Sequence, residues 1–259
     1  MYGLLDDLQY LIGSALLFNS ASGSRPWDMA ALSRGREVEA KNEYKWRPLV
    51  LRSSVRCIAM SRSGAVLTGH DDGTVCAFTP SGTPCSLASD EASPIGGGSG
   101  TVKMHNTAVT CLVPSLGGGV WTMSAAGSVR FITPGGYRSD LELKAPGKKR
   151  AHNSAIAAAA LTPEGTLWTA AVILRVWTSG GEWRQSLQTH AGKVLSMVAI
   201  DARVWVGHQD GRVLVFDAFT AVCIAKLQDD GRHSAVLSLC AVGECTESCT
   251  QIRVQLTLD

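Results

Sequence analysis

An internal repeat constrains this chain more than any other feature of its sequence. Segments of one residue pattern start at Val55, Val109, Ile156 and Val194, and these starts are 54, 47 and 38 residues apart. A fifth segment begins 42 residues later, at Val236, and soon loses the pattern. Repeats of about 40–45 residues are typical of folds in which similar units bury their apolar faces against their neighbours.

Each repeat predicts a set of short antiparallel strands. A unit opens with five or six mostly apolar residues, continues with a pair such as Val204-Trp205, and ends in a third apolar run. Gly, Asp and Ser fill the turns, where Gly73 and Gly211 can supply the positive φ that tight hairpins need. Residues 223–227 can add a fourth, outer strand. Four strands in such a length correspond to one blade of a β-propeller.

Small residues and histidines recur at fixed places in these units. The third residue of the first strand is small in all five units: Cys57, Cys111, Ala158, Ser196 and Ser238. Large side chains would overpack there, because the inner strands of neighbouring blades crowd together. Four histidines precede a first strand, and the other two, His70 and His208, share one turn position. The sequence therefore predicts an all-β β-propeller with four clear blades and a partial fifth.

The histidine before the first strand, the turn Asp and the aromatic residue that ends the third strand resemble the WD-repeat family. The resemblance covers about residues 50–245. It implies a structural hydrogen-bond network within the blades, with these members: His105, His152, His190, His233, Asp72, Asp210, Trp177 and Phe216. Only the fourth unit has a residue at every place of the network, so the other blades are expected to rely on packing.

Three phrases, VLTGHDDGTVCAF, VWTMSAAGSVRF and VWVGHQDGRVLVFD, resemble a narrower group. They are similar to the propeller that precedes the catalytic domain of plant-type inositol polyphosphate 5-phosphatases. The catalytic signatures of that family, a Trp-x-Gly-Asp-x-Asn run and a Trp-Cys-Asp-Arg run, are absent from this chain. A P-loop lysine, a Gly-x-Ser-x-Gly elbow and a His-Glu-x-x-His helix are absent too, so we predict no catalytic residue and no cofactor.

The ends of the chain are less regular than its repeats. Apolar residues at helical spacing predict a short amphipathic helix over residues 1–18, followed by a connector to residue 43. We therefore predict two parts, 1–43 as helix and connector and 44–259 as the propeller. Residues 44–51 can form a strand that completes the last blade.

Two clusters of side chains are candidate sites outside the repeat. Four cations lie within seven residues, which suits an acidic partner or an anionic head group but also fits a solvated loop: Lys144, Lys148, Lys149 and Arg150. Cys240, Cys245 and Cys249 with His233 lack the paired spacing of a structural zinc site. Cys240 also stands at a first-strand position and is expected in the core, so we predict no metal site.

Composition excludes several classes of partner and location. A net charge of +2 gives no reason to expect nucleic acid, and no apolar run approaches the roughly 20 residues needed to cross a membrane. Asp6 and Asp7 come before the first basic residue, so we predict no secretory signal. The chain is therefore expected in the cytoplasm with its cysteines reduced.

Three functions remain open from the sequence. The first is a non-catalytic scaffold that binds a protein or peptide on a propeller face. The second is the regulatory propeller of an inositol polyphosphate 5-phosphatase, cut from its catalytic half. The third is a purely structural part of an assembly. Four or five blades would leave apolar faces bare, so either residues 1–54 and 240–259 hide degenerate strands or the ring is incomplete. We expect the incomplete ring, and that the isolated chain associates.

Overall fold

A computed structural model describes residues 53–61, 63–85, 100–133, 138–189, 192–228, 235–243 and 250–256. Within these ranges every regular element is a β-strand. They form four antiparallel sheets of four consecutive strands each and one sheet of two strands. The helix expected at 1–18, its connector and the strand expected at 44–51 lie outside the described residues.

The sheets follow the repeat units of the sequence. The first contains β1 (Val55–Met60), β2 (Val66–His70), β3 (Thr74–Phe78) and β4 (Thr101–Lys103). The second contains β5 (Val109–Pro114), β6 (Val120–Ser124), β7 (Val129–Ile132) and β8 (Arg138–Glu142). The third contains β9 (Ala158–Leu161), β10 (Leu167–Ala170), β11 (Leu174–Trp177) and β12 (Trp183–Leu187). The fourth contains β13 (Val194–Ile200), β14 (Arg203–His208), β15 (Val213–Asp217) and β16 (Cys223–Leu227).

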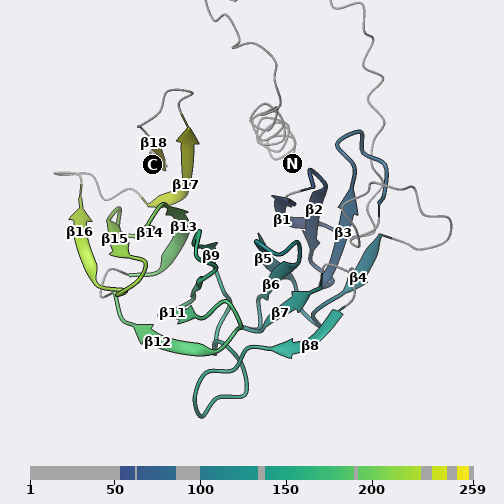
Figure 1. Cartoon of the computed structure of the whole chain (residues 1–259), viewed down its shortest axis with the longest axis horizontal. Helices are drawn as coiled ribbons and strands as arrows, with labels where there is room; N and C mark the ends of the chain where they lie inside the picture. Colours follow the sequence, from purple (N-terminus) through teal and green to yellow (C-terminus); the bar gives the residue numbers. More distant parts are fainter. Residues whose placement is uncertain are drawn as a thin grey trace, which may run out of the picture. The chain divides into compact units, whose positions relative to one another are not determined.

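The fifth sheet pairs β17 (Val236–Gly243) with β18 (Thr250–Leu256). It is the partial unit that the sequence predicts, and the outer strand expected at 223–227 is present as β16. The first strands of successive sheets pack side by side in the order β1, β5, β9, β13 and β17 (Figure 1). In a β-propeller, similar four-stranded sheets pack against one another with their first strands innermost, and each sheet is a blade. The sheets of this chain have that arrangement.

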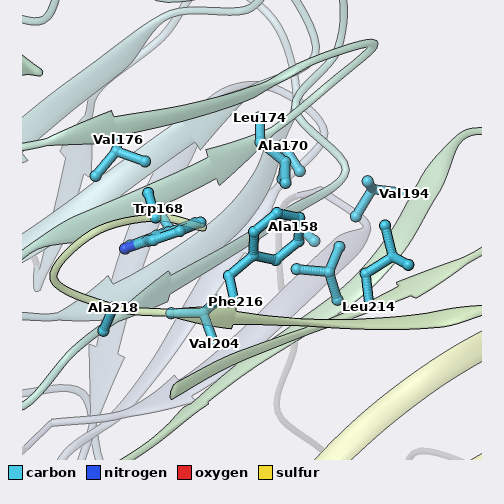
Figure 2. Close-up of a cluster of buried hydrophobic side chains, with 12 residues drawn as sticks. Ala158, Trp168, Ala170, Leu174, Val176, Val194, Val204, Leu214, Phe216 and Ala218 are labelled. Carbon is cyan, nitrogen blue, oxygen red and sulfur yellow. The ribbon is translucent and has the colours of Figure 1, made fainter. Parts of the chain in front are cut away.

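Neighbouring blades share apolar cores. In the cluster between the third and fourth blades, Trp168 packs against Phe216 with ring centroids 5.7 Å apart, beside Val194 and Val204 (Figure 2). Burying such a side chain contributes about 1.5–3 kcal/mol, so each interface contributes substantially to stability. An isolated blade would lose this burial, which is why the repeat is needed to stabilise each unit.

The inner strands divide their side chains between the two neighbouring blades. In β5, β13 and β17, residues one and four face the preceding blade, as Val109 and Leu112 do in the core that they share with Leu67. Residues three and five face the following blade, as Val198 does in the core that it shares with Val236. This division follows from the alternation of side chains along a strand, shifted by a bulge after the first residue.

The small third residue makes room for the next blade and also binds it. The Cys57 thiol donates to the carbonyl of Val109 over 3.5 Å, and the Ser196 hydroxyl donates to the carbonyl of Val236 over 2.9 Å. A Cβ added to Gly207 on the neighbouring strand would lie 2.4 Å from the Ser196 hydroxyl oxygen. The same Cβ would lie 2.5 Å from a methyl carbon of Val236, so β14 of the same blade and the first strand of the next both limit the space at this position. The polar contact to the next blade is an addition that sequence analysis missed.

The prediction that Cys240 belongs to the core is wrong. Cys240 is the fifth residue of β17 and is exposed, whereas its equivalent Val198 on β13 packs against the blade that follows. The difference arises because β17 belongs to the last of the described blades, so its trailing side chains have no described neighbour.

Candidate partner-binding face

The turns between second and third strands lie beside the segments that lead into the next blade. The amide of His105 donates to the carbonyl of Gly73 over 3.1 Å, and the amide of His152 donates to the carbonyl of Gly127 over 2.8 Å. Both glycines have left-handed φ values, +86° and +81°. A Cβ at Gly127 would lie 2.3 Å from the His152 carbonyl oxygen, so glycine is required there. We call this end of the blades the turn face and define it by residues 71–73, 103–106, 125–127 and 144–153.

A basic side chain ties each of these segments to its turn. The Lys103 ammonium donates to the carbonyl of Asp72, and a guanidinium nitrogen of Arg150 donates to the carbonyl of Ala126 over 3.1 Å. Lys103 and Arg150 each stand two residues before a histidine, and both acceptors occupy the same turn position. Arg150 therefore anchors its own loop to the turn as well as contributing charge.

The cations expected to bind an acidic partner lie together on one anchored loop. We call residues 144–150, between β8 and β9, the basic loop. Its four cations, Lys144, Lys148, Lys149 and Arg150, are all exposed. The buried Ala145 fixes the loop, because its amide donates to the Arg150 carbonyl over 3.3 Å and its carbonyl accepts from the Lys148 amide over 2.9 Å.

Within the part of the chain that the structure describes, no carboxylate lies within ion-pair distance of the basic loop's cations. The nearest acidic residue in sequence, Glu142, pairs instead with Arg130 over 3.1 Å. The loop therefore presents a local excess of positive charge on a backbone held by hydrogen bonds and by buried neighbours. Such an excess attracts anions and is attenuated by salt.

Two arginines at equivalent positions of the second and third blades bind the backbone of the turn face. Arg130 on β7 donates to the carbonyl of Met104 over 2.7 Å, and Arg175 at the equivalent place on β11 donates to the carbonyl of Ala151. Each acceptor is the residue that precedes a histidine of the repeat. Sequence analysis missed both arginines. Each is the second residue of the third strand of its unit, and this recurrence was visible in the sequence.

His105 and His152 are buried and hydrogen-bonded to side chains of their blades. His105 is buried and its ring nitrogens lie 2.8 Å from the hydroxyls of Thr122 and Ser128. His152 is buried too, and its Nε2 lies 2.8 Å from the Thr169 hydroxyl. In both blades the histidine reaches the threonine 17 residues further on, in the middle of the second strand. Neither imidazole is accessible to a substrate.

In the third blade an aromatic residue joins the histidine and the threonine. The indole Nε1 of Trp177 donates to the Thr169 hydroxyl over 2.9 Å, and the same oxygen binds His152. Burial, and secondarily the nearby Arg175, lower the pKa of His152 to about 3, so the imidazole is neutral. We expected only the fourth unit to have the histidine, the turn Asp and the aromatic residue together; in the third blade, which lacks the turn Asp, a threonine links the histidine to the tryptophan.

The first blade reaches the same threonine position from a different histidine. Nε2 of His70, at the end of β2, lies 2.9 Å from the Thr68 hydroxyl, and its Nδ1 lies 3.0 Å from the Ser53 carbonyl oxygen. The threonines Thr68, Thr122 and Thr169 are thus equivalent. Their recurrence in the phrases VLT, VWT and LWT was visible in the sequence, and sequence analysis missed it.

The fourth blade has an apolar residue at this place. Val206 replaces the threonine, and Nε2 of the buried His208 has no hydrogen-bond partner among the described residues. Burial lowers the pKa of His208, which keeps the ring neutral. Phe216 is buried against Trp168, and His190 and His233 lie outside the described residues.

The two turn aspartates stabilise their own hairpins. Asp72 accepts from the amide and hydroxyl of Thr74 over 2.9 and 2.6 Å, and these bonds lower its pKa. Asp210 accepts from the amide of Arg212 over 3.2 Å and forms an ion pair with its guanidinium. Burial raises the pKa of Asp210, but the bonds from Arg212 outweigh it, so the net shift is downward.

Cysteines and apolar segments offer no further site in the described region. Its six cysteines are free, and its ranges contain no group of three His, Cys, Asp or Glu side chains that could hold a metal ion. Cys245, Cys249 and His233 of the considered zinc set lie outside those ranges. Nor does any described segment form a helix with the length and apolar character to cross a bilayer.

Comparisons with known proteins identify the fold. No protein-family model matches the sequence, and no curated protein matches it either. Among solved structures, a chain of the "Crystal Structure of Mitotic Checkpoint Complex" matches with a TM-score of 0.58 and 15% identity. The match covers 75% of this chain and 57% of that chain, so it spans little more than half of the solved chain.

The fold is a β-propeller. Similarity at 15% identity shows the fold alone, and it agrees with the blade order described above. With 1371 solved chains matching, the fold is too widespread to indicate a single function.

Proposed function

We propose that this chain is a non-catalytic β-propeller scaffold that binds an acidic segment of a protein partner through the basic loop. One observation carries the proposal: four exposed cations extend from an anchored loop that no described carboxylate neutralises. A single exposed ion pair contributes about 0–1 kcal/mol, so recognition requires several cations acting on one ligand.

The fold and its comparison support this role. Exposed loops on a rigid scaffold are where binding residues concentrate, and the basic loop has its base in the buried core through Leu143 and Ala145. The similar solved chain belongs, by its title, to a complex. The six described cysteines are free thiols, which suits the reducing cytoplasm where we place this scaffold.

A charge-reversal experiment tests the proposal. Binding of a fluorescein-labelled Glu-rich peptide is measured by anisotropy for the full chain and for the variant K144E/K148E/K149E. Loss of three cations should weaken binding by about ten-fold or more, and added salt should weaken the parent in the same direction. The matched control K193E/R203E/K226E makes the same change in net charge at exposed residues elsewhere.

The control decides whether binding is local. If both triple variants lose the peptide equally, attraction to net charge explains the binding and the proposed site is wrong. An anionic membrane is the other ligand that four cations can bind. Cosedimentation with vesicles containing phosphatidylinositol phosphates, together with no peptide binding, would replace the protein partner by a head group.

The phosphatase alternative stays a prediction from the strand phrases of the first, second and fourth units. Its test is the coding sequence that follows the codon for Asp259. Phosphatase signatures there would make the basic loop part of a regulatory propeller instead of a free scaffold.

A further inference from the structure

Among the described residues, the blades at the two ends of the series each have one side without a neighbouring blade. Among the described inner strands, β5, β9 and β13 each lie between two others, whereas β1 packs against β5 alone and β17 against β13 alone (Figure 1). The exposure of individual residues on β1 and β17 identifies the uncovered sides.

On β1 the uncovered side is the one that would face a preceding blade. The first residues of the later inner strands are buried, as Val109 and Val236 are with no exposed surface, but Val55 remains partly exposed. The fourth residue of β17, Leu239, is 8% exposed, whereas its equivalent Ile58 on β1 is 38% exposed. We call Val55 and Ile58 the leading face.

On β17 the uncovered side is the one that would face a following blade. The third residue of β13, Ser196, is buried and donates to the Val236 carbonyl over 2.9 Å. Its equivalent Ser238 is exposed, and so is the fifth residue, Cys240. We call Ser238 and Cys240 the trailing face.

We propose that the leading face of one copy of this chain binds the trailing face of another. Each face has the residues of one side of the contact that neighbouring blades form within the molecule. In that contact a first-strand valine enters beside a small residue, and the hydroxyl or thiol of that residue binds the valine carbonyl. Ser238 accordingly donates to the carbonyl of the second copy's Val55, and Ile58 covers Cys240.

A second copy is the occupant because it carries the matching surface in every molecule. Val55 and Ile58 of the leading face are equivalent to Val236 and Leu239, which pack against Val198 of the fourth blade. Each copy offers one leading and one trailing face, so the contact is head-to-tail and can extend or close into a ring. The contact does not depend on the basic loop or on its ligand.

Light scattering on the full 259-residue chain tests this contact. We expect a mass that rises with concentration above the 27.4 kDa of one copy. Ile58→Glu disables the leading face and Ser238→Trp the trailing face, so each variant alone should remain at 27.4 kDa. An equimolar mixture of the two variants keeps one intact face of each kind and should give a dimer of twice that mass. Val172→Glu changes a residue that is 77% exposed on the β10–β11 turn, and it should associate like the parent.

Several results would overturn the proposal. A parent chain that stays at 27.4 kDa at every concentration means that another segment covers these faces. Association that survives both substitutions, or variants that fail to pair when mixed, shows that a different surface is responsible. Because Ile58 and Ser238 are exposed in a single copy, both variants should keep the parent's circular dichroism spectrum.

A crosslink gives a second, independent measurement. Ile58→Cys places a thiol opposite Cys240 of the other copy, so mild oxidation with diamide should yield disulfide-linked multimers on a non-reducing gel. Adding Cys240→Ser to that variant should abolish them. Crosslinks that persist without Cys240, or none in either variant, would contradict the proposed pairing.

Discussion

Replacing Thr169 by valine should destabilise the propeller strongly for so small a change. The Thr169 hydroxyl lies 2.8 Å from Nε2 of His152 and accepts from Nε1 of Trp177 over 2.9 Å, and all three residues are buried. Valine keeps the shape but leaves two buried nitrogens without a partner. Each lost hydrogen bond costs about 1 kcal/mol, and an orphaned buried group costs about 1–3 kcal/mol, so we expect a loss of about 2–4 kcal/mol.

Urea unfolding followed by tryptophan fluorescence measures this loss. With a slope of about 2 kcal/mol per molar urea, the midpoint should fall by about 1–2 M. Thr166→Val is the matched control, because Thr166 is only half-buried on the turn before β10; its change should stay within about 0.5 kcal/mol. If Thr169→Val lowers stability no more than Thr166→Val does, the buried bridge is not what holds the third blade.

Three further predictions follow from the same contacts. Val206→Thr places a hydroxyl beside Nε2 of His208, which has no partner among the described residues, as Thr68 does for His70, and should raise the free energy of unfolding by about 1 kcal/mol. Thr68→Val should lower that free energy, and a change of the same sign for both variants would contradict this. Because the pKa of His152 falls to about 3 on folding, the free energy of unfolding should decline as pH drops below about 6.5, by up to about 1.4 kcal/mol per pH unit. The decline should be less steep in His152→Gln, and equal pH slopes for the two proteins would refute this. In thermal melts, Gly127→Ala should destabilise more than Gly147→Ala, since both have positive φ but only the first meets a carbonyl oxygen; equal melting temperatures would refute the steric argument.

The blade architecture was predictable because it depends on local patterns that recur. Alternating apolar runs, turn glycines and the small third residue give β1, β5 and β13 within a residue or two. The repetition predicted how the units are arranged, which a single segment does not, because five similar units bury their apolar faces by packing against each other. The outer strand β16 followed from its place after the third strand of the unit.

The hydrogen-bond networks were predictable only in part. A histidine before a strand indicates that a network exists, but its partner depends on how the histidine lies in three dimensions. Thr169 serves His152 whereas Thr68 serves His70, from opposite sides in the sequence. The exposure of Cys240 was not predictable from its position, because it depends on whether another blade follows β17.

The candidate site was visible as a charge cluster but not as a structure. Sequence shows Lys144, Lys148 and Lys149 close together, which describes a solvated loop equally well. The bond from Arg150 to the turn and the burial of Ala145 depend on packing between segments, and only the structure supplies them.

In β5, β13 and β17 the first residue of the inner strand packs into the preceding blade. A nuclear Overhauser spectrum of valine-methyl-labelled protein tests it directly, through the contact between Val236 and Gly207, where an added Cβ would meet the valine methyl carbon at 2.5 Å. The blade order predicts strong cross-peaks from the Val236 methyls to the Gly207 α-protons, and likewise from Val109 to Gly69. Absence of both, with the Val236 methyls contacting residues of the first or second blade instead, would contradict it.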